Sequence, residues 1–201
     1  MQNIAIKSDF EDYSKAFLEE NAKHNLISKN DEKFLYEKHI YDSLGINLFF
    51  EKYNIKSAKI LDIGCGGGFP CLPIAIEHPS MKIVGIDSIR KKIASVQTVS
   101  EKLGLKNIEL LCDRVENLKD RSFDIVVSRA VANMTKISEY ALPLVKKNGY
   151  FIAYKSKKAL EELENAEATL KKLNAKVIDI IEYKLPLEEI YERNLVCIKK
   201  F

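Results

Sequence analysis

The sequence predicts an α/β fold: a doubly wound, mostly parallel sheet of seven strands, with helices on both faces and a helical extension at the N-terminus. From residue 59 onward, short β-type apolar segments alternate with amphipathic helical segments, the pattern of a parallel sheet with crossover helices. A glycine-rich turn follows the first strand, and the last two strands come after the last helix, which predicts a terminal hairpin. A length of 201 residues suits one well-buried domain with a small appendage.

Residues 1–55 are predicted to form the helical extension, and residues 56–201 the domain that contains the sheet. Aromatic and aliphatic residues recur every three to four positions in two stretches, Phe10–Leu18 and Phe34–Leu44, which is helical spacing. The extension could serve as a lid, as a platform for a substrate or as a cover for one edge of the sheet. The sequence does not choose among these three roles.

The elements of the sheet domain follow in order. The predicted strands are Lys59–Ile63, Lys82–Asp87, Ile108–Cys112, Phe123–Ser128, Gly149–Tyr154, Lys176–Tyr183 and Leu195–Lys199. The helices predicted between them are Pro70–Glu77, Ile89–Leu103, Thr135–Val145 and Lys157–Leu173. Ligands of such sheets bind beyond the carboxyl ends of the parallel strands, so the residues that follow each strand are the candidates for a site.

The composition excludes several classes of protein. Apolar residues make up 46% of the chain and charged residues 30%, as in an ordinary globular domain, and no run approaches the ~20 apolar residues of a membrane-spanning helix. The N-terminus lacks the layout of a signal peptide, and the four cysteines form no C-x-x-C pair. We therefore expect a cytoplasmic protein with reduced thiols, no metal site and no membrane segment. The net charge of +3 allows an anionic partner without requiring one.

A cluster of glycines follows the first predicted strand, with four of the chain's eight glycines at positions 64–68. Glycine adopts positive φ and lets the backbone approach a ligand closely, so this cluster indicates a nucleotide-type site. A P-loop would need a lysine in the turn, and a dinucleotide fingerprint would need a third glycine where Phe69 or Cys71 stands. The remaining pattern, an acid two residues before G-x-G-x-G, resembles motif I of the S-adenosylmethionine-dependent methyltransferases and consists of Asp62, Gly64, Gly66 and Gly68.

Each of the first two predicted strands contains an acid near its end, and both acids fit such a cofactor. S-adenosylmethionine has no pyrophosphate, so the turn can pack against its methionine part while Asp62 faces the ammonium group. Asp87 ends the next strand about 20 residues beyond the turn, where α/β folds place the acid that receives ribose hydroxyls. Either carboxylate alone is more commonly a helix cap or a solvent-facing group. Their combination with the glycine turn favours a cofactor site.

A wider set of segments occurs in an order typical of one family. These segments are Asn25-Leu26-Ile27-Ser28, His39-x-x-Asp42-Ser43, Asp62 to Pro70, Asp87-Ser88-x-Arg90-Lys91-Lys92, Arg114-Val115-Glu116, Ser128-Arg129-Ala130 and Lys155. On them the chain resembles the RsmG family, formerly glucose-inhibited division protein B, the bacterial 16S ribosomal RNA guanine-N7 methyltransferases. The resemblance runs from about Asn25 to Lys199, with Cys71 and Ser156 standing where the family commonly has glycine.

The resemblance implies a Rossmann-like class I methyltransferase fold with S-adenosylmethionine as the cofactor. It places the family's cofactor contacts on Gly64, Phe69, Val115, Glu116 and Arg129. With motif I and the end of the second strand added, the expected cofactor-binding residues are Asp62, Gly64, Gly66, Gly68, Phe69, Asp87, Ser88, Val115, Glu116 and Arg129. The resemblance also implies 16S ribosomal RNA or the small ribosomal subunit as the partner, and we expect a monomer.

The chemistry implied by the family needs little from the protein's titratable groups. Guanine N7 already has an available lone pair, so its methylation needs no general base and can proceed mainly by alignment of the two reactants. The catalytic residues are therefore undefined by the sequence, with Arg129 and His39 as candidates. A histidine within an amphipathic helix is more often a structural residue, and we expect His39 and Asp42 to fix the N-terminal helices over the pocket.

Two groups of basic residues are candidates for contact with RNA phosphates. They are Arg90, Lys91 and Lys92 after the second strand, and Lys155 and Lys157 after the fifth. A solvated charged face is the plain alternative for both groups. Two other functions stay open at this point: a methyltransferase for a small molecule or a protein, and a non-catalytic S-adenosylmethionine-binding regulator.

Overall fold

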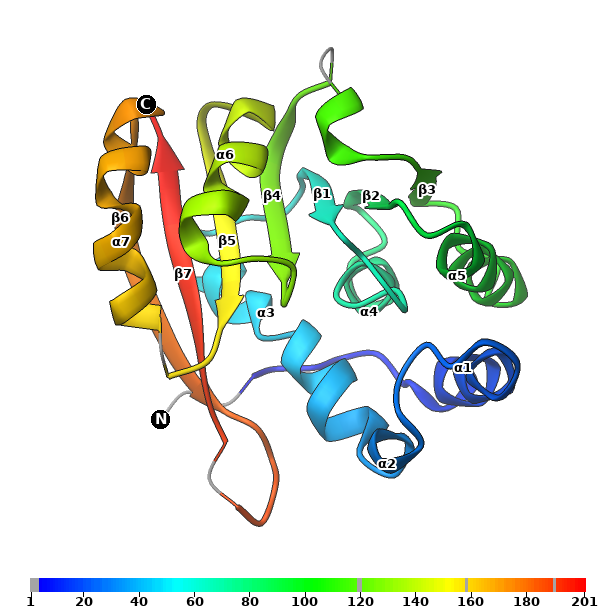
Figure 1. Cartoon of the computed structure of the whole chain (residues 1–201). Helices are drawn as coiled ribbons and strands as arrows, with labels where there is room; N and C mark the ends of the chain where they lie inside the picture. Colours follow the sequence, from blue (N-terminus) through cyan, green and yellow to red (C-terminus); the bar gives the residue numbers. More distant parts are fainter. Residues whose placement is uncertain (1–3, 119–120, 158, 190) are drawn as a thin grey trace.

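The computed structural model describes residues 4–118, 121–157, 159–189 and 191–201. It contains a seven-stranded sheet of order β3-β2-β1-β4-β5-β7-β6 (Figure 1). The strands are β1 Lys59–Ile63, β2 Lys82–Asp87, β3 Ile108–Cys112, β4 Phe123–Arg129, β5 Val145–Lys155, β6 Ala175–Lys184 and β7 Glu192–Lys200. The first three strands have the predicted bounds, and the others extend beyond them. The longest extension is in β5, because Val145 already pairs with Phe123 before a register shift.

The sheet is parallel except at β7. β1 pairs in parallel with β2 and β4, whereas β7 lies antiparallel between β5 and β6. The predicted terminal hairpin is therefore confirmed. The parallel pairing brings the carboxyl ends of β1, β2, β4 and β5 to one edge of the sheet, where the arrowheads of β4 and β5 point in Figure 1. We call this the carboxyl edge.

Helices cover both faces of the sheet, as predicted, and create two hydrophobic cores. One core contains Ile60 and Ile83 with α4 Cys71–Glu77 and α5 Arg90–Lys102. The other contains Leu61 and Val84 with α6 Met134–Leu144 and α7 Ala159–Lys172. Neighbouring strand residues point to opposite faces, which is why these alternating apolar side chains fill both cores.

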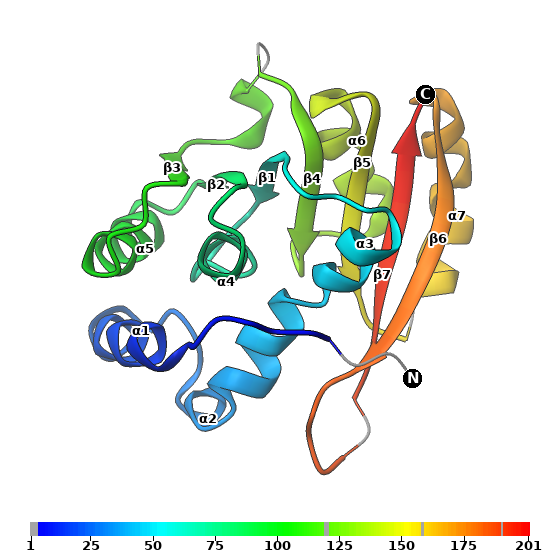
Figure 2. The ribbon, with the colours of Figure 1, turned by 180° about the vertical axis from the view of Figure 1, so that it is seen from behind.

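The N-terminal extension is helical, as predicted. Its elements are α1 Glu11–His24, α2 Lys29–Glu32, the π-helical segment η1 Leu35–Tyr41 and α3 Ile46–Lys52. Figure 2 shows them on the same side of the sheet as α4 and α5. Fully buried Phe17 and Phe49 join the same core as Ile60, so the extension shares a core with the sheet. The division of the chain at residue 55 stays a prediction.

No helix in the described ranges is both long and apolar enough to cross a membrane.

Candidate active site

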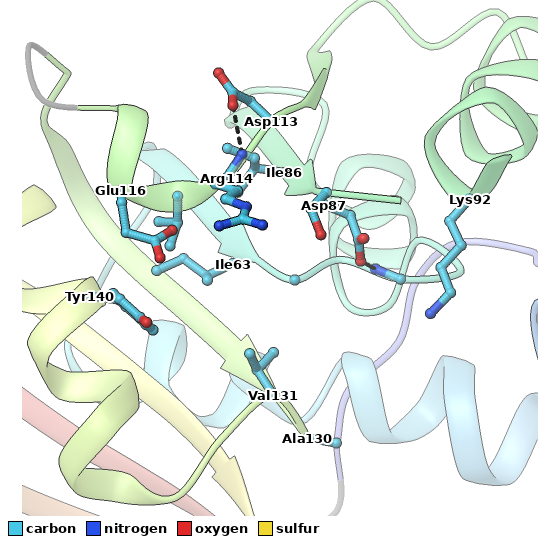
Figure 3. Close-up of a pocket in the computed structure, with 14 residues that line it drawn as sticks. Ile63, Ile86, Asp87, Lys92, Asp113, Arg114, Glu116, Ala130, Val131 and Tyr140 are labelled. Atoms are coloured by element: carbon cyan, nitrogen blue, oxygen red, sulfur yellow. Dashed lines mark hydrogen bonds between the residues drawn. The ribbon is translucent and has the colours of Figure 1, made fainter. Parts of the chain in front are cut away.

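A cavity of about 490 Å³ opens at the carboxyl edge, and we call it the edge cavity (Figure 3). Its volume lies in the range of about 300–1,000 Å³ that is common for small-molecule sites. The walls come from the ends of β1, β2, β3 and β4, from the 3₁₀ turn η2 Val115–Asn117 and from α6. The predicted cofactor residues that line it are Gly64, Gly66, Asp87, Ser88, Val115 and Glu116.

The glycine turn at residues 64–68 contributes Gly64 and Gly66 to the wall of the edge cavity. The backbone N–H groups of Gly64 and Cys65 both donate to the carbonyl oxygen of Ile86, at 2.8 and 3.0 Å, which ties the turn to β2. Gly64 has a φ of +69°, and a Cβ atom there would lie 2.6 Å from Cγ2 of Val131. Only glycine permits both this conformation and the close approach of the chain after β4.

Asp87 is held in place at the end of β2. Its Oδ2 accepts a hydrogen bond from the N–H of Gly66 at 3.0 Å, and its Oδ1 accepts one from the N–H of Ile89 at 2.8 Å. Each carboxylate oxygen can accept a second hydrogen bond. Asp87 therefore has acceptor capacity left for hydroxyl groups of a ligand in the cavity that it lines.

The remaining walls of the edge cavity divide into apolar and charged parts. Ile63, Ile86 and Val115 supply aliphatic surface, and Figure 3 shows Tyr140 and Glu116 together at one end of the cavity. Lys92 lies at the other end. Aliphatic and aromatic walls suit a purine base, an anchored acid suits a ribose diol, and a cation beside a glycine turn suits an amino-acid carboxylate. These residues fit the three parts of S-adenosylmethionine.

Asp62 does not line the edge cavity, contrary to the expectation that it faces a ligand ammonium. Its side chain is fully buried, and Oδ2 accepts the N–H of Cys71 at 3.1 Å, at the start of α4. Oδ1 has no hydrogen-bond partner among the described residues. Burial raises the pKa of Asp62 to about 7. Because Ile63 faces the cavity, strand alternation directs Asp62 to the opposite face of the sheet.

Gly68 and Phe69 also lie outside the cavity lining, so a direct role in holding the cofactor is not supported by their position. Gly68 has a φ of +92°, and a Cβ atom there would meet Leu72 at 2.7 Å. The ring of Phe69 packs with Phe17 and His39, with centroids 5.0 and 4.9 Å apart. Phe69 thus joins the glycine turn to the N-terminal extension, whereas Gly68 packs against α4.

Arg129 ends β4, but its guanidinium points into the N-terminal extension and is absent from the cavity lining. Its Nη1 donates to Oδ2 of Asp42 at 2.9 Å and to the carbonyl oxygen of Lys38 at 3.2 Å. Its Nη2 donates to Nδ1 of His39 at 3.1 Å. The guanidinium also lies 5.2 Å from the ring centroid of Phe69. In this structure Arg129 therefore connects the extension to the sheet.

His39 is poorly suited to acid–base catalysis in this arrangement. Burial and the nearby Arg129 charge lower its pKa to about 4, so the imidazole is neutral at physiological pH. Since Nδ1 accepts from Arg129, the ring proton is on Nε2, which has no partner among the described residues. The expected structural role of His39 agrees with these contacts.

Asp42 is the centre of a buried group that we call the Asp42 cluster, with Arg129, Arg193 and Tyr183. Arg193 donates through Nε to Oδ1 at 2.8 Å and through Nη2 to Oδ2 at 3.1 Å, and the Tyr183 hydroxyl donates to Oδ1 at 2.6 Å. Burial would raise the pKa of Asp42, but the charges of Arg193 and Arg129 outweigh it and hold the pKa below its ordinary value. The cluster joins the end of η1 to three strands.

The basic residues predicted to contact RNA have different surroundings. Arg90 and Lys91 are exposed at the start of α5, and Lys92 lines the edge cavity itself. Lys157 is exposed before α7. The ammonium of Lys155 is largely buried and donates to Glu162 at 2.6 Å and to the carbonyl oxygen of Ala132 at 2.9 Å, so its contacts lie within the protein and do not support the predicted contact with RNA.

Several cavity residues were missed by the sequence reasoning. They are Ile63, Ile86, Val131 and Tyr140, together with Lys92, which was assigned to RNA. Asp113 and Arg114, which also line the cavity, directly follow β3 and are among the candidates that the strand-end rule selects. Tyr140 gives no such signal, because it lies in the middle of α6.

The fold and the edge cavity define a class I S-adenosylmethionine-dependent methyltransferase. The chain matches the GidB family, described as rRNA small subunit methyltransferase G, over residues 6–195. It belongs to this family. The protein named ribosomal RNA small subunit methyltransferase G from Staphylococcus saprophyticus is 40% identical over 198 residues, covering 96% of this chain and 82% of the relative. Its counterpart in Oceanobacillus iheyensis is 42% identical over 193 residues, covering 94% and 80%.

Solved structures at much lower identity share the fold. A ribosomal protein L11 methylase from Lactobacillus delbrueckii subsp. bulgaricus superposes with a TM-score of 0.61 at 15% identity, covering 80% of this chain and 79% of the other. M. jannaschii TYW2, in complex with AdoMet, gives a TM-score of 0.58 at 14% identity, covering 73% and 70%. The predicted fold class and family are thus confirmed.

Proposed function

We propose that this chain transfers the methyl group of S-adenosylmethionine to N7 of a guanine in 16S ribosomal RNA of the small subunit. Its membership of a family described as rRNA small subunit methyltransferase G supports the RNA substrate. The observation that carries the cofactor assignment is the glycine turn whose Gly66 N–H fixes the Asp87 carboxylate at the edge cavity. The proposed setting is the bacterial cytoplasm, and the proposed active form is a monomer.

Bound S-adenosylmethionine supplies an electrophilic methyl group on a sulfonium centre. The role of the protein is to align that group with the N7 lone pair and to exclude water, since N7 has no proton to remove. The pKa of His39, lowered to about 4, makes its imidazole a weak base, which agrees with a reaction that needs no general base. Cys65 and Cys71 are buried, and burial raises the pKa of Cys71, so neither thiol is suited to the covalent catalysis of pyrimidine C5 methylation.

Arg90 and Lys91 support the RNA part of the proposal. They are exposed at the start of α5, in sequence next to Lys92 at the edge cavity, where they could meet phosphates beside the target base. Replacing both by alanine should weaken RNA binding and lower the slope of log affinity against log salt by up to about 2, one for each phosphate that is no longer neutralised. Lys106→Ala is the control, because Lys106 is exposed just before β3, at the amino edge of the sheet.

The test of the function uses tritium-labelled S-adenosylmethionine and small ribosomal subunits, or their RNA, from cells that lack this methylation. We expect label in 16S RNA, and strand scission after reduction and aniline treatment at the labelled guanine, which is specific for N7. Asp87→Asn serves as the control with impaired cofactor binding. Unlabelled RNA, under conditions in which calorimetry shows cofactor binding, would favour a small-molecule or protein substrate or a non-catalytic binding role.

A further inference from the structure

Tyr140 is the one aromatic side chain among the described residues that line the edge cavity. Figure 3 shows it beside Glu116, at the end of the cavity away from Lys92, with Ile63 between it and the centre. The residue is half-buried, so part of its surface is available to a ligand. Neither the family resemblance nor the strand-end rule assigned it a role.

The position of Tyr140 is fixed by its helix. Asn133 caps α6 by accepting the N–H of Lys136 at 2.9 Å, and fully buried Met134 and Ile137 anchor the first turns in the core. The ammonium of Lys136, one turn earlier, lies 4.7 Å from the centroid of the Tyr140 ring. A cation in that position occupies one face of the ring and leaves the remaining ring surface for the cavity.

The order of groups along the cavity determines which part of a nucleoside reaches Tyr140. Figure 3 shows Asp87 between Lys92 at one end and Glu116 at the other, and Tyr140 adjoins Glu116. A ribose held by Asp87, with the amino-acid part toward Lys92, directs its base to the end that Tyr140 closes. The aliphatic side chain of Ile63 supplies surface on the way to that end (Figure 3).

We infer that Tyr140 is the aromatic platform for the adenine base of S-adenosylmethionine. This inference depends on the cofactor part of the proposed function. Contact of a base with an aromatic ring contributes about 1–3 kcal/mol, which corresponds to about a 5- to 150-fold change in affinity. Tyr140→Leu removes the aromatic ring and Tyr140→Phe retains it.

The chain contains no tryptophan, so Tyr140→Trp introduces a single indole reporter at the platform. We expect its fluorescence to change on titration with S-adenosylmethionine, S-adenosylhomocysteine or adenosine, and to stay constant with methionine. Tyr36→Trp is the matched control, since Tyr36 is 45% exposed on η1 and lies outside the edge-cavity lining. Unchanged fluorescence of the Tyr140→Trp variant, in protein that calorimetry shows to bind S-adenosylmethionine, would overturn the inference.

Calorimetry on the Leu and Phe variants gives the second measurement. The inference requires about a 5- to 150-fold loss of S-adenosylmethionine affinity for Tyr140→Leu and near wild-type affinity for Tyr140→Phe. Equal affinity of wild type and Tyr140→Leu for S-adenosylmethionine would overturn the inference on Tyr140 and would leave the proposed RNA methylation standing. If wild type binds the cofactor but labels no RNA, the proposed substrate fails and the adenine platform stands. Should Tyr140→Leu fail to fold, the fluorescence titration of Tyr140→Trp still decides.

Discussion

Replacing Asp42 by asparagine should destabilise the protein far more than the corresponding replacement of an acid in an exposed ion pair. The Asp42 side chain is 4% exposed, and its carboxylate accepts hydrogen bonds from Arg129, Arg193 and Tyr183. Asparagine keeps the shape but removes the negative charge and turns one acceptor into a donor facing other donors. Two guanidinium groups, 13% and 15% exposed, then lose their counter-charge.

The expected cost is that of breaking a buried ion pair, about 3–5 kcal/mol in the free energy of unfolding. For a chain of this size, about 2–4 °C of melting temperature are lost per kcal/mol, so we expect a decrease of about 6–20 °C. Urea denaturation followed by circular dichroism measures the free energy, and differential scanning calorimetry measures the melting temperature.

Glu109→Gln is the matched control. Glu109 forms a two-point pair with Arg121, through Nη1 at 3.1 Å and Nη2 at 2.6 Å, but its side chain is 51% exposed. An exposed pair of this kind contributes less than about 1 kcal/mol. If Asp42→Asn costs no more than Glu109→Gln, the Asp42 cluster does not hold the extension to the sheet.

The pH dependence gives an independent check on Asp42. Its folded-state pKa lies below the ordinary value, so its ionised form stabilises the fold above the unfolded-state pKa. That contribution is lost as the pH falls from about 4 through the folded-state pKa. The stability difference between wild type and Asp42→Asn should therefore be constant near neutral pH and shrink in acid. A difference independent of pH down to the acid transition would contradict an electrostatic role.

Three further predictions concern the glycine turn and the acids beside it. Asp87→Asn should weaken S-adenosylmethionine binding by about 1.5–3 kcal/mol, the range for hydrogen bonds to a charged group, and unchanged affinity in calorimetry would exclude a ribose contact. Gly64→Ala should cost about 1–3 kcal/mol of stability and impair cofactor binding, because its Cβ would meet Val131 at 2.6 Å. Adding Val131→Ala should restore part of the loss, whereas Gly104→Ala, also at positive φ but with nothing within 4 Å, should lose only about 1 kcal/mol. The pKa of Asp62 in the folded state is raised to about 7, so the carboxyl group binds its proton more tightly in the folded than in the unfolded chain. The free energy of unfolding of wild type, relative to that of Asp62→Asn, should therefore fall as the pH rises from about 4 to 7. A flat difference in urea titrations across that range would mean that Asp62 titrates normally.

Local patterns were sufficient to predict the elements and one part of the site. Alternating apolar residues and the glycine turn place β1 and β2 correctly, because strand period and turn chemistry depend on neighbours in sequence. The carboxyl-edge rule then leads to Asp87, Val115 and Glu116, which all line the edge cavity. The same period of two, applied to β1, would have directed Asp62 away from the cavity that Ile63 faces.

Tertiary structure alone decided the rest of the site. Asp42 meets Arg129 and Arg193 across 87 and 151 positions of sequence, and Lys155 is neutralised by Glu162 of the following helix. Tyr140 reaches the edge cavity only because α6 packs against the sheet at one particular height and rotation. Sequence by itself determined where strands, turn and strand-end acids lie, since these depend on short-range sterics and alternation. Which charges are paired, and which aromatic ring faces the cavity, depends on the packing of distant segments, which no local pattern encodes.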